Sequence, residues 1–65
     1  MVDYRKIEFL RGRYNLTQVE LANNIGITQP TLNAILNGRK QPSVAVLKKI
    51  SDIFNVKMED LLLAE

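Results

Sequence analysis

Residues 17–37, TQVELANNIGITQPTLNAILN, contain two short helical segments that are separated by a glycine. Thr17 and Glu20 have the spacing of a capping box, in which the hydroxyl and the carboxylate each satisfy a free backbone N–H at a helix start. Gly26 can adopt the left-handed conformation that commonly ends a helix. Thr28 is then the N-cap of the second segment. Two helices joined so tightly predict that the second crosses the first and protrudes from the surface.

Apolar residues continue at helical spacing on both sides of this pair. Upstream, Asp3 can cap a helix over about residues 3–14; downstream, Ser43 can cap another that ends near Asn55, followed by a last helix over about residues 58–63. The inward positions expected in the flanking helices are Ile7, Leu10, Tyr14, Val44, Leu47, Ile50 and Phe54. No stretch alternates as a strand does, so the sequence predicts an all-α, compact five-helix bundle containing a helix-turn-helix.

The third helix leaves one face that the core does not use. Its members fall at i, i+1, i+4, i+5 and i+8, and they are Gln29, Pro30, Asn33, Ala34 and Asn37. This face carries no charge, whereas an ordinary solvated face usually carries Lys and Glu. An amide presents a donor and an acceptor together and can pair with both groups on the major-groove edge of adenine, while small apolar groups can contact a thymine methyl. The face is therefore a candidate for reading bases.

Composition bounds the remaining possibilities. The 65 residues form one expected domain and include neither cysteine nor histidine, which excludes the usual zinc-ligand sets and the commonest nucleophile–base pairs. The carboxylates are explained by caps and solvated faces, so we expect no catalytic residue, metal, cofactor or small-molecule ligand. No apolar stretch is long enough to span a membrane and no leader precedes the domain, so the expected location is the cytoplasm of a prokaryote or phage host, on the nucleoid.

Charge is distributed unevenly along the chain. Residues 1–51 carry eight Lys and Arg against three carboxylates, a net charge of +5, and residues 52–65 carry one Lys against four carboxylates, a net charge of −3. A basic body suits a protein that places one side on a polyanion. Gln18, in the first turn of the second helix, and Asn37, Arg39 and Lys40, after the third, are candidate phosphate contacts. Gln18 is equally well explained as a simple helix former.

Several segments, in order, resemble the phage lambda/434 repressor and Cro family of helix-turn-helix domains, also called the XRE family. They are LTQVELA (16–22), IGITQPTL (25–32), NG (37–38), PSV (42–44) with Leu47, NV (55–56) and EDLL (59–62). The resemblance covers about residues 5–63 and implies a sequence-specific, double-stranded DNA-binding transcriptional regulator, most often a repressor. It assigns base contacts to Gln29, Pro30, Asn33 and Ala34. It assigns backbone contacts to Gln18, Thr28 and Asn37. Thr31, Arg39 and Lys40 are further candidate backbone contacts.

Two positions depart from the family pattern. Leu36 stands where the family usually has a glutamate that pairs with a basic residue of the first helix, so we expect Arg11 to lack that partner. Our hypothesis is that Arg11 turns to a DNA phosphate instead. Lys57 stands where the family prefers a serine or threonine cap, so the last helix is expected to begin poorly and to fray.

The family also implies a homodimer on a palindromic operator. Three consecutive leucines near the end cannot all face the core, so the expected dimer surface comprises Val56, Met58, Leu62 and Leu63. An alternative is a protein-interaction or antitoxin-type module of the same fold. Single-strand RNA binding is disfavoured because the few aromatic residues, Phe9 among them, are expected to be buried or half-buried.

Overall fold

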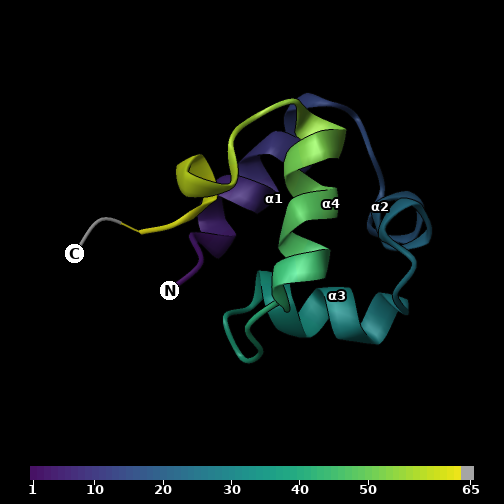
Figure 1. The fold of residues 1–65 in the computed structure, drawn as a ribbon. Coiled ribbons are helices and arrows are strands. Elements are labelled where there is room, and N and C mark those ends of the chain that lie inside the picture. Colours follow the sequence, from purple (N-terminus) through teal and green to yellow (C-terminus); the bar gives the residue numbers. More distant parts are fainter. Residues whose placement is uncertain (64–65) are drawn as a thin grey trace.

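The computed structural model describes residues 1–63, which form four α-helices and one final 3-10 turn (Figure 1). The helices are α1 (Tyr4–Arg13), α2 (Gln18–Ile25), α3 (Gln29–Leu36) and α4 (Val44–Phe54), and the 3-10 turn is η1 (Met58–Leu61). The prediction of a fifth α-helix is therefore wrong, because the four residues of η1 make a single, tighter 3-10 turn. None of the helices in residues 1–63 combines the length and apolar character needed to cross a membrane.

The helix starts form as the sequence predicts. The Thr17 hydroxyl accepts from the Glu20 N–H over 3.1 Å, and the Glu20 carboxylate accepts from the Thr17 N–H over 2.9 Å, which completes the capping box. Gly26 ends α2 in the left-handed region with a φ of 86°. The hydroxyls of Thr28 and Ser43 cap α3 and α4. These contacts satisfy backbone N–H groups that a helix start otherwise leaves free.

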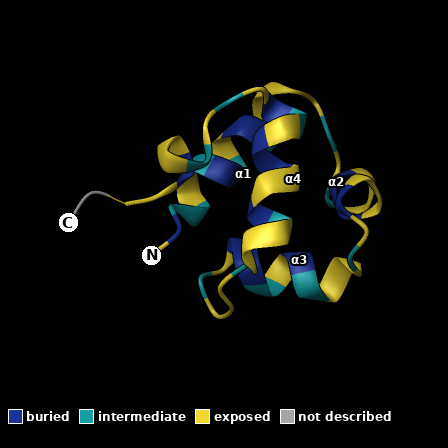
Figure 2. Ribbon diagram, in the orientation of Figure 1, coloured by how far each residue is buried: buried dark blue, intermediate teal, exposed yellow. Residues whose placement is uncertain are grey.

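The core forms around α4. In Figure 1, α4 runs through the middle of the molecule, α3 crosses its lower end and α2 is seen end-on beside it. Figure 2 shows the buried residues along the inward faces of the helices, with exposed residues on the outer turns. The largest fully buried side chains are Phe54, Ile7, Leu21, Ile25, Leu32, Ile35, Ile50 and Leu61. Every helix and η1 contributes to this list, so α3 is fixed against the rest of the domain through its inward face.

Two side chains lie elsewhere than expected. Val44 is 74% exposed, because it is the first residue of α4 and the core of that helix begins only at Leu47. Phe9 is 63% exposed, because a helix places it about 200° around the axis from the buried Ile7.

Tyr14 is partly exposed but tied to the core. Its ring packs edge-on against Phe54 with 5.1 Å between the centroids, and its hydroxyl donates to the Phe54 carbonyl over 2.9 Å. This bond satisfies a carbonyl at the end of α4 that has no partner within the helix.

The two ends of the described chain pair with each other. Val2 and Leu62 form an isolated antiparallel bridge, flanked by hydrogen bonds from Asp3 N–H to the Leu61 carbonyl (2.7 Å) and from Leu63 N–H to the Met1 carbonyl (2.9 Å). Val2 is buried by this pairing. The pairing holds η1 against α1.

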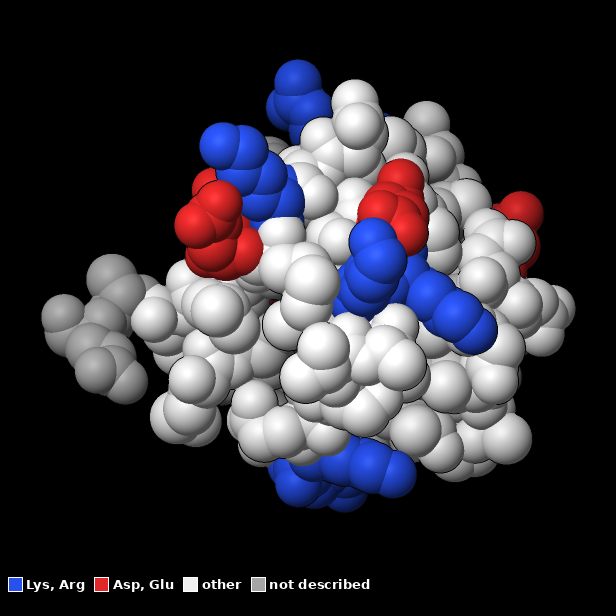
Figure 3. Space-filling view, viewed as in Figure 1, with Lys and Arg blue, Asp and Glu red and all other residues white. Residues whose placement is uncertain are grey.

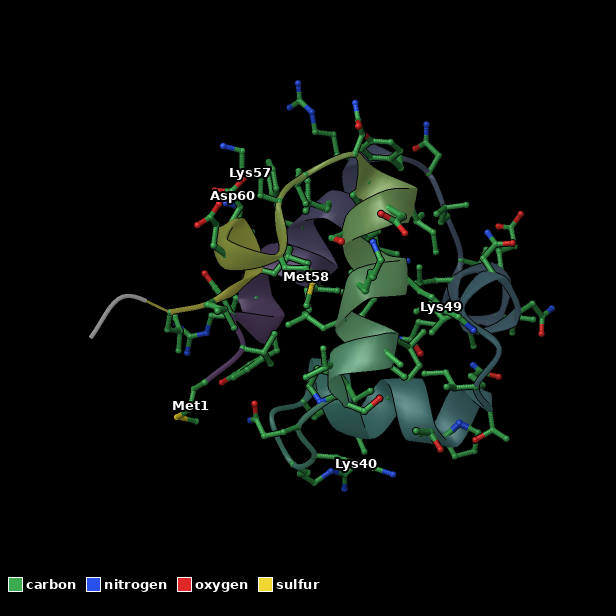
Figure 4. The ribbon with its side chains drawn as sticks, viewed as in Figure 1. Met1, Lys40, Lys49, Lys57, Met58 and Asp60 are labelled. Carbon is green, nitrogen blue, oxygen red and sulfur yellow. The ribbon has the colours of Figure 1, made fainter. Side chains whose placement is uncertain are left out.

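The start of η1 has no side-chain cap from Lys57, as its residue type predicts. The Asp60 carboxylate instead accepts a hydrogen bond from the Lys57 backbone N–H over 3.2 Å, and Figure 4 shows the two side chains on the same side of η1. The carboxylate thus replaces half of a capping box. The poor cap expected at Lys57 is thus present, and the fraying of this segment stays a prediction.

Candidate nucleic-acid interface

A side chain of α4 holds the joint between α2 and α3 in place. The ammonium group of Lys49 donates to the Ile25 carbonyl at the end of α2 over 3.2 Å, and Figure 4 shows Lys49 reaching from α4 towards α2. Gly26 follows at once, and its N–H donates to the Ala22 carbonyl over 2.8 Å. A cation at a helix C-terminus also favours the helix dipole. The direction in which α3 leaves α2 is therefore set by tertiary contacts as well as by the glycine.

The outward face of α3 carries the four residues that the sequence assigned to bases. Gln29, Pro30 and Asn33 are exposed, and Ala34 is half-buried. Their inward neighbours on the helix are buried, so the four residues lie on one side of α3. The stripe predicted from spacing is therefore present as a surface of amides and small groups.

A shallow hollow of about 260 Å³ lies along this face. It is lined by Gln29, Pro30, Asn33 and Arg39. The sequence placed Arg39 with the basic turn that follows α3, and its presence beside the stripe was not predicted. Next to the hollow, the amide nitrogen of Asn37 donates to the side-chain oxygen of Asn33 over 2.5 Å.

The basic turn after α3 is folded back onto the helix. Gly38 has a φ of 77°, and the N–H groups of Arg39 and Lys40 both donate to the Ala34 carbonyl, over 2.9 and 3.2 Å. In Figure 4, Lys40 lies below the end of α3, and Figure 3 shows basic side chains gathered at this edge with no acidic side chain beside them. A positive edge next to an uncharged amide stripe is an arrangement suited to a polyanion with a readable surface.

The N-terminal segment holds this turn in place, which the sequence did not predict. The Tyr4 ring packs so closely on Gly38 that a Cβ there would lie 2.9 Å from the ring. The side-chain oxygen of Gln41 accepts a hydrogen bond from the Val2 N–H over 3.2 Å. Both contacts join residues more than 30 positions apart, so no local pattern could have indicated them.

The starts of α2 and α3 hold the remaining predicted backbone contacts. Gln18 is the first residue of α2 and is half-buried. The hydroxyls of Thr28 and Thr31 are hydrogen-bonded to each other over 2.8 Å at the start of α3. Hydrogen bonds from the Thr17 backbone N–H and the Thr17 side chain lower the pKa of Glu20, which keeps that carboxylate charged beside the N-terminus of α2.

Arg11 has a carboxylate partner after all. Its Nε donates to Glu8 over 2.9 Å, a second guanidinium nitrogen also contacts that carboxylate, and a third hydrogen bond goes to the Leu16 carbonyl over 2.7 Å. Arg11 thus lacks the family's partner at position 36, where Leu36 stands, but Glu8, one turn earlier on the same helix, takes that place. The hydrogen bond from Arg11 lowers the pKa of Glu8.

The four residues expected at a dimer surface divide into two groups. Val56 and Met58 are half-buried and pack against the core, whereas Leu62 and Leu63 are 47% and 45% exposed. Figure 4 shows Met58 lying between η1 and α4. Only the two leucines present substantial apolar surface.

The sequence of the chain is similar to those of known helix-turn-helix proteins. A family model described as helix-turn-helix matches residues 7–61. The chain is 38% identical over 60 residues to the uncharacterized HTH-type transcriptional regulator MJ0272 of Methanocaldococcus jannaschii, and the alignment covers 92% of this chain and 91% of that one. It is 37% identical over 60 residues to the uncharacterized HTH-type transcriptional regulator YgzD of Bacillus subtilis, with the same coverage.

Among solved structures, a chain of the SinR protein/SinI protein complex superimposes with a TM-score of 0.84 and 26% sequence identity. The superposition covers 92% of the present chain but only 59% of the other. The likeness therefore concerns the helical domain and leaves two fifths of the other chain without a counterpart.

Proposed function

Because the chain belongs to the helix-turn-helix family of transcriptional regulators, we propose that it binds specific sites in double-stranded DNA with α3 in the major groove. The observation that carries this proposal is the exposed, uncharged amide stripe on α3 next to the basic turn. An α-helix fits the major groove of B-DNA, where each base pair presents a distinct pattern of donors and acceptors.

The residues of the stripe supply the base contacts in this proposal. Gln29, at the start of α3, is exposed and can pair with both groups on the edge of adenine. Pro30 and Ala34 offer apolar surface to thymine methyl groups, and Asn33 offers a second amide. Direct reading of sequence thus depends mainly on two amides, since neither apolar residue can distinguish donors from acceptors.

Phosphate contacts orient the domain on the duplex. Gln18 at the start of α2, and Thr28 and Thr31 at the start of α3, lie at helix N-termini, where free N–H groups and the helix dipole favour an anion. Arg39 and Lys40 follow the other end of α3, and Asn37 keeps one amide hydrogen that Asn33 does not use. Together these groups bracket α3 at both ends.

We further propose a homodimer on a palindromic operator and repression by occupying that operator. One domain of this size reaches few base pairs, and a two-fold pair doubles the reading length. The exposed Leu62 and Leu63 supply most of the proposed contact between copies, to which the half-buried Val56 and Met58 add.

Selection of sites from random duplex DNA tests the proposal. The purified chain should enrich a palindromic motif, and Gln29→Ala should weaken binding to the best site by about 1–3 kcal/mol while broadening base preference. Asn24→Ala changes an exposed amide of α2 outside the interface and serves as the control. Equal loss on selected and scrambled DNA would remove the reading role of Gln29. Absence of enrichment even at low salt, where phosphate contacts are strongest, would favour a protein-binding module of the same fold.

A further inference from the structure

We propose that the hollow on α3 reads a guanine, with Arg39 as a base-contacting residue and Asn37 as the residue that orients Asn33. This inference rests on the proposed function, because it names the base recognised within that interface. It replaces two assignments: the pairing of Asn33 with adenine, and the phosphate contact given to Arg39 both by the sequence and in the proposed function above.

The first support is the position of Arg39. It lines the hollow together with Gln29 and Asn33, so Arg39 lies beside the stripe that would face the base edges. The backbone explains this position, since the hydrogen bond from Arg39 N–H to the Ala34 carbonyl turns the chain back along α3. Among residues 1–63 the ion pairs are Glu8–Arg11 and Lys48–Asp52, so no described carboxylate engages the Arg39 guanidinium.

The second support is the orientation of the Asn33 amide. Its oxygen already accepts a hydrogen bond from Asn37, while both hydrogens of its amino group remain free for a ligand. Adenine needs an acceptor for its N6 amino group and a donor for N7. Guanine presents only acceptors, O6 and N7, in the major groove. With one of its two oxygen lone pairs taken by Asn37 and both amino hydrogens free, Asn33 offers more donors than acceptors, which favours guanine over adenine.

The lining of the hollow as a whole agrees with an acceptor-bearing ligand. Arg39 has only donors, and its planar guanidinium can address O6 and N7 of one guanine together. Pro30 contributes apolar surface, and no carboxylate lines the hollow to accept from the amino group of cytosine. Gln29 is exposed at the first position of α3, which leaves its amide free to read the neighbouring base pair.

Lys40 supplies a matched comparison within the same turn. It carries the same charge one residue later, and its N–H shares the Ala34 carbonyl, but it does not line the hollow. An ammonium group at the outer edge of the turn suits a phosphate, which carries no sequence information. Removing the charge at these two positions should therefore have different consequences for base preference.

The experiment compares site selection by the unaltered chain with selection by Arg39→Gln, Arg39→Lys and Lys40→Gln, after thermal melts show that each variant is folded. The unaltered chain should require guanine at one position of each half-site. Both Arg39 variants should lose that preference by roughly tenfold while preferences at other positions persist. Lys40→Gln should weaken all sequences alike. Uniform weakening by Arg39→Gln, matching that of Lys40→Gln, would overturn the proposal.

Asn37→Ala tests the orientation of Asn33 separately. Freed from Asn37, the Asn33 amide can present donor and acceptor together, so adenine should become acceptable at the guanine position. An undiminished guanine preference in Asn37→Ala would show that Asn37 does not orient the amide. A motif without guanine in the unaltered chain would overturn the base assignment alone, whereas no motif at all would overturn the proposed DNA-binding function itself.

Discussion

The guanidinium of Arg11 donates a hydrogen bond to the backbone carbonyl of Leu16, with 2.7 Å between nitrogen and oxygen. Because Glu8 holds the other side of the same guanidinium, Arg11 connects the end of α1 to the loop that precedes α2. Leu16 is followed directly by the capping residue Thr17, so this connection helps to fix where α2 begins.

We expect Arg11→Ala to lower the free energy of unfolding by about 1–2 kcal/mol, because charge-assisted hydrogen bonds to Glu8 and Leu16 are lost. Urea unfolding measures this, with Arg13→Ala as the control, since Arg13 is exposed and in the last turn of the same helix. Arg13→Ala should change stability by less than about 0.5 kcal/mol.

The same variant tests the hypothesis that Arg11 contacts a DNA phosphate. With its guanidinium engaged within the domain, Arg11 should leave the salt dependence of DNA binding unchanged when it is replaced. A salt slope reduced by about one in Arg11→Ala would instead identify a phosphate contact.

The Glu8 carboxylate makes stability depend on acid. The hydrogen bond from Arg11 lowers the pKa of Glu8 from its ordinary value of 4.5 in the folded state. A lowered folded pKa stabilises the fold above the unfolded pKa, and this stabilisation disappears as the pH falls through the lower value. The free energy of unfolding should therefore decrease as the pH falls below about 5.

Glu8→Gln should remove part of that decrease, and urea unfolding between neutral and acid pH measures it. Glu59→Gln is the control, because Glu59 is exposed and forms no ion pair among residues 1–63. If Glu8→Gln retained the full pH dependence, the pair with Arg11 would contribute nothing to stability in solution.

Two glycines with the same backbone conformation should respond differently to alanine. Gly26 and Gly38 have φ values of 86° and 77°, so each substitution carries the left-handed cost of about 1–2 kcal/mol. At Gly26 the nearest atom to the new Cβ is the Lys49 ammonium at 3.7 Å, whereas at Gly38 it is the Tyr4 ring at 2.9 Å. Gly38→Ala should therefore lower the melting temperature further than Gly26→Ala. Equal shifts would mean that the ring moves aside without cost.

Leu63→Glu should weaken the proposed self-association without unfolding the domain, because this side chain is partly exposed and a charge there opposes an apolar contact. Sedimentation equilibrium should show a shift towards monomer, and affinity should fall for a full palindrome but not for a half-site. Phe9→Glu changes an exposed apolar residue on α1 and is the control. Loss of self-association in Phe9→Glu alone would place the dimer surface on α1.

Features set by neighbours in the sequence were predicted well. The capping box of Thr17 and Glu20 and the left-handed Gly26 depend on residues within a few positions of one another, and all formed as expected. Ser51 shows where an apolar pattern fails: it occupies a buried position of α4 because its hydroxyl donates to the Lys48 carbonyl one turn back over 2.7 Å. A polar residue satisfied within its own helix leaves no sign in hydrophobic spacing.

Features set by distant contacts were not predicted. The bridge between Val2 and Leu62 joins residues 60 positions apart, and the contact of Gln41 with Val2 spans 39 positions. The candidate site contains features of both kinds, local and long-range. The stripe beginning at Gln29 followed from helical spacing, whereas the place of Arg39 depends on a turn whose path is set by tertiary contacts.

Asp3 belongs to both ends of the chain: its carboxylate caps α1 at the Lys6 N–H, and its own N–H donates to the Leu61 carbonyl. The first turn of the domain therefore cannot open alone, because the atoms that begin α1 are bonded to those that end η1. In amide hydrogen exchange, Asp3 and Leu63 should lose protection together, as one cooperative unit, although they lie 60 positions apart in the sequence. If one end of the chain opens, the hydrogen bonds of the other end should then break in the same opening event.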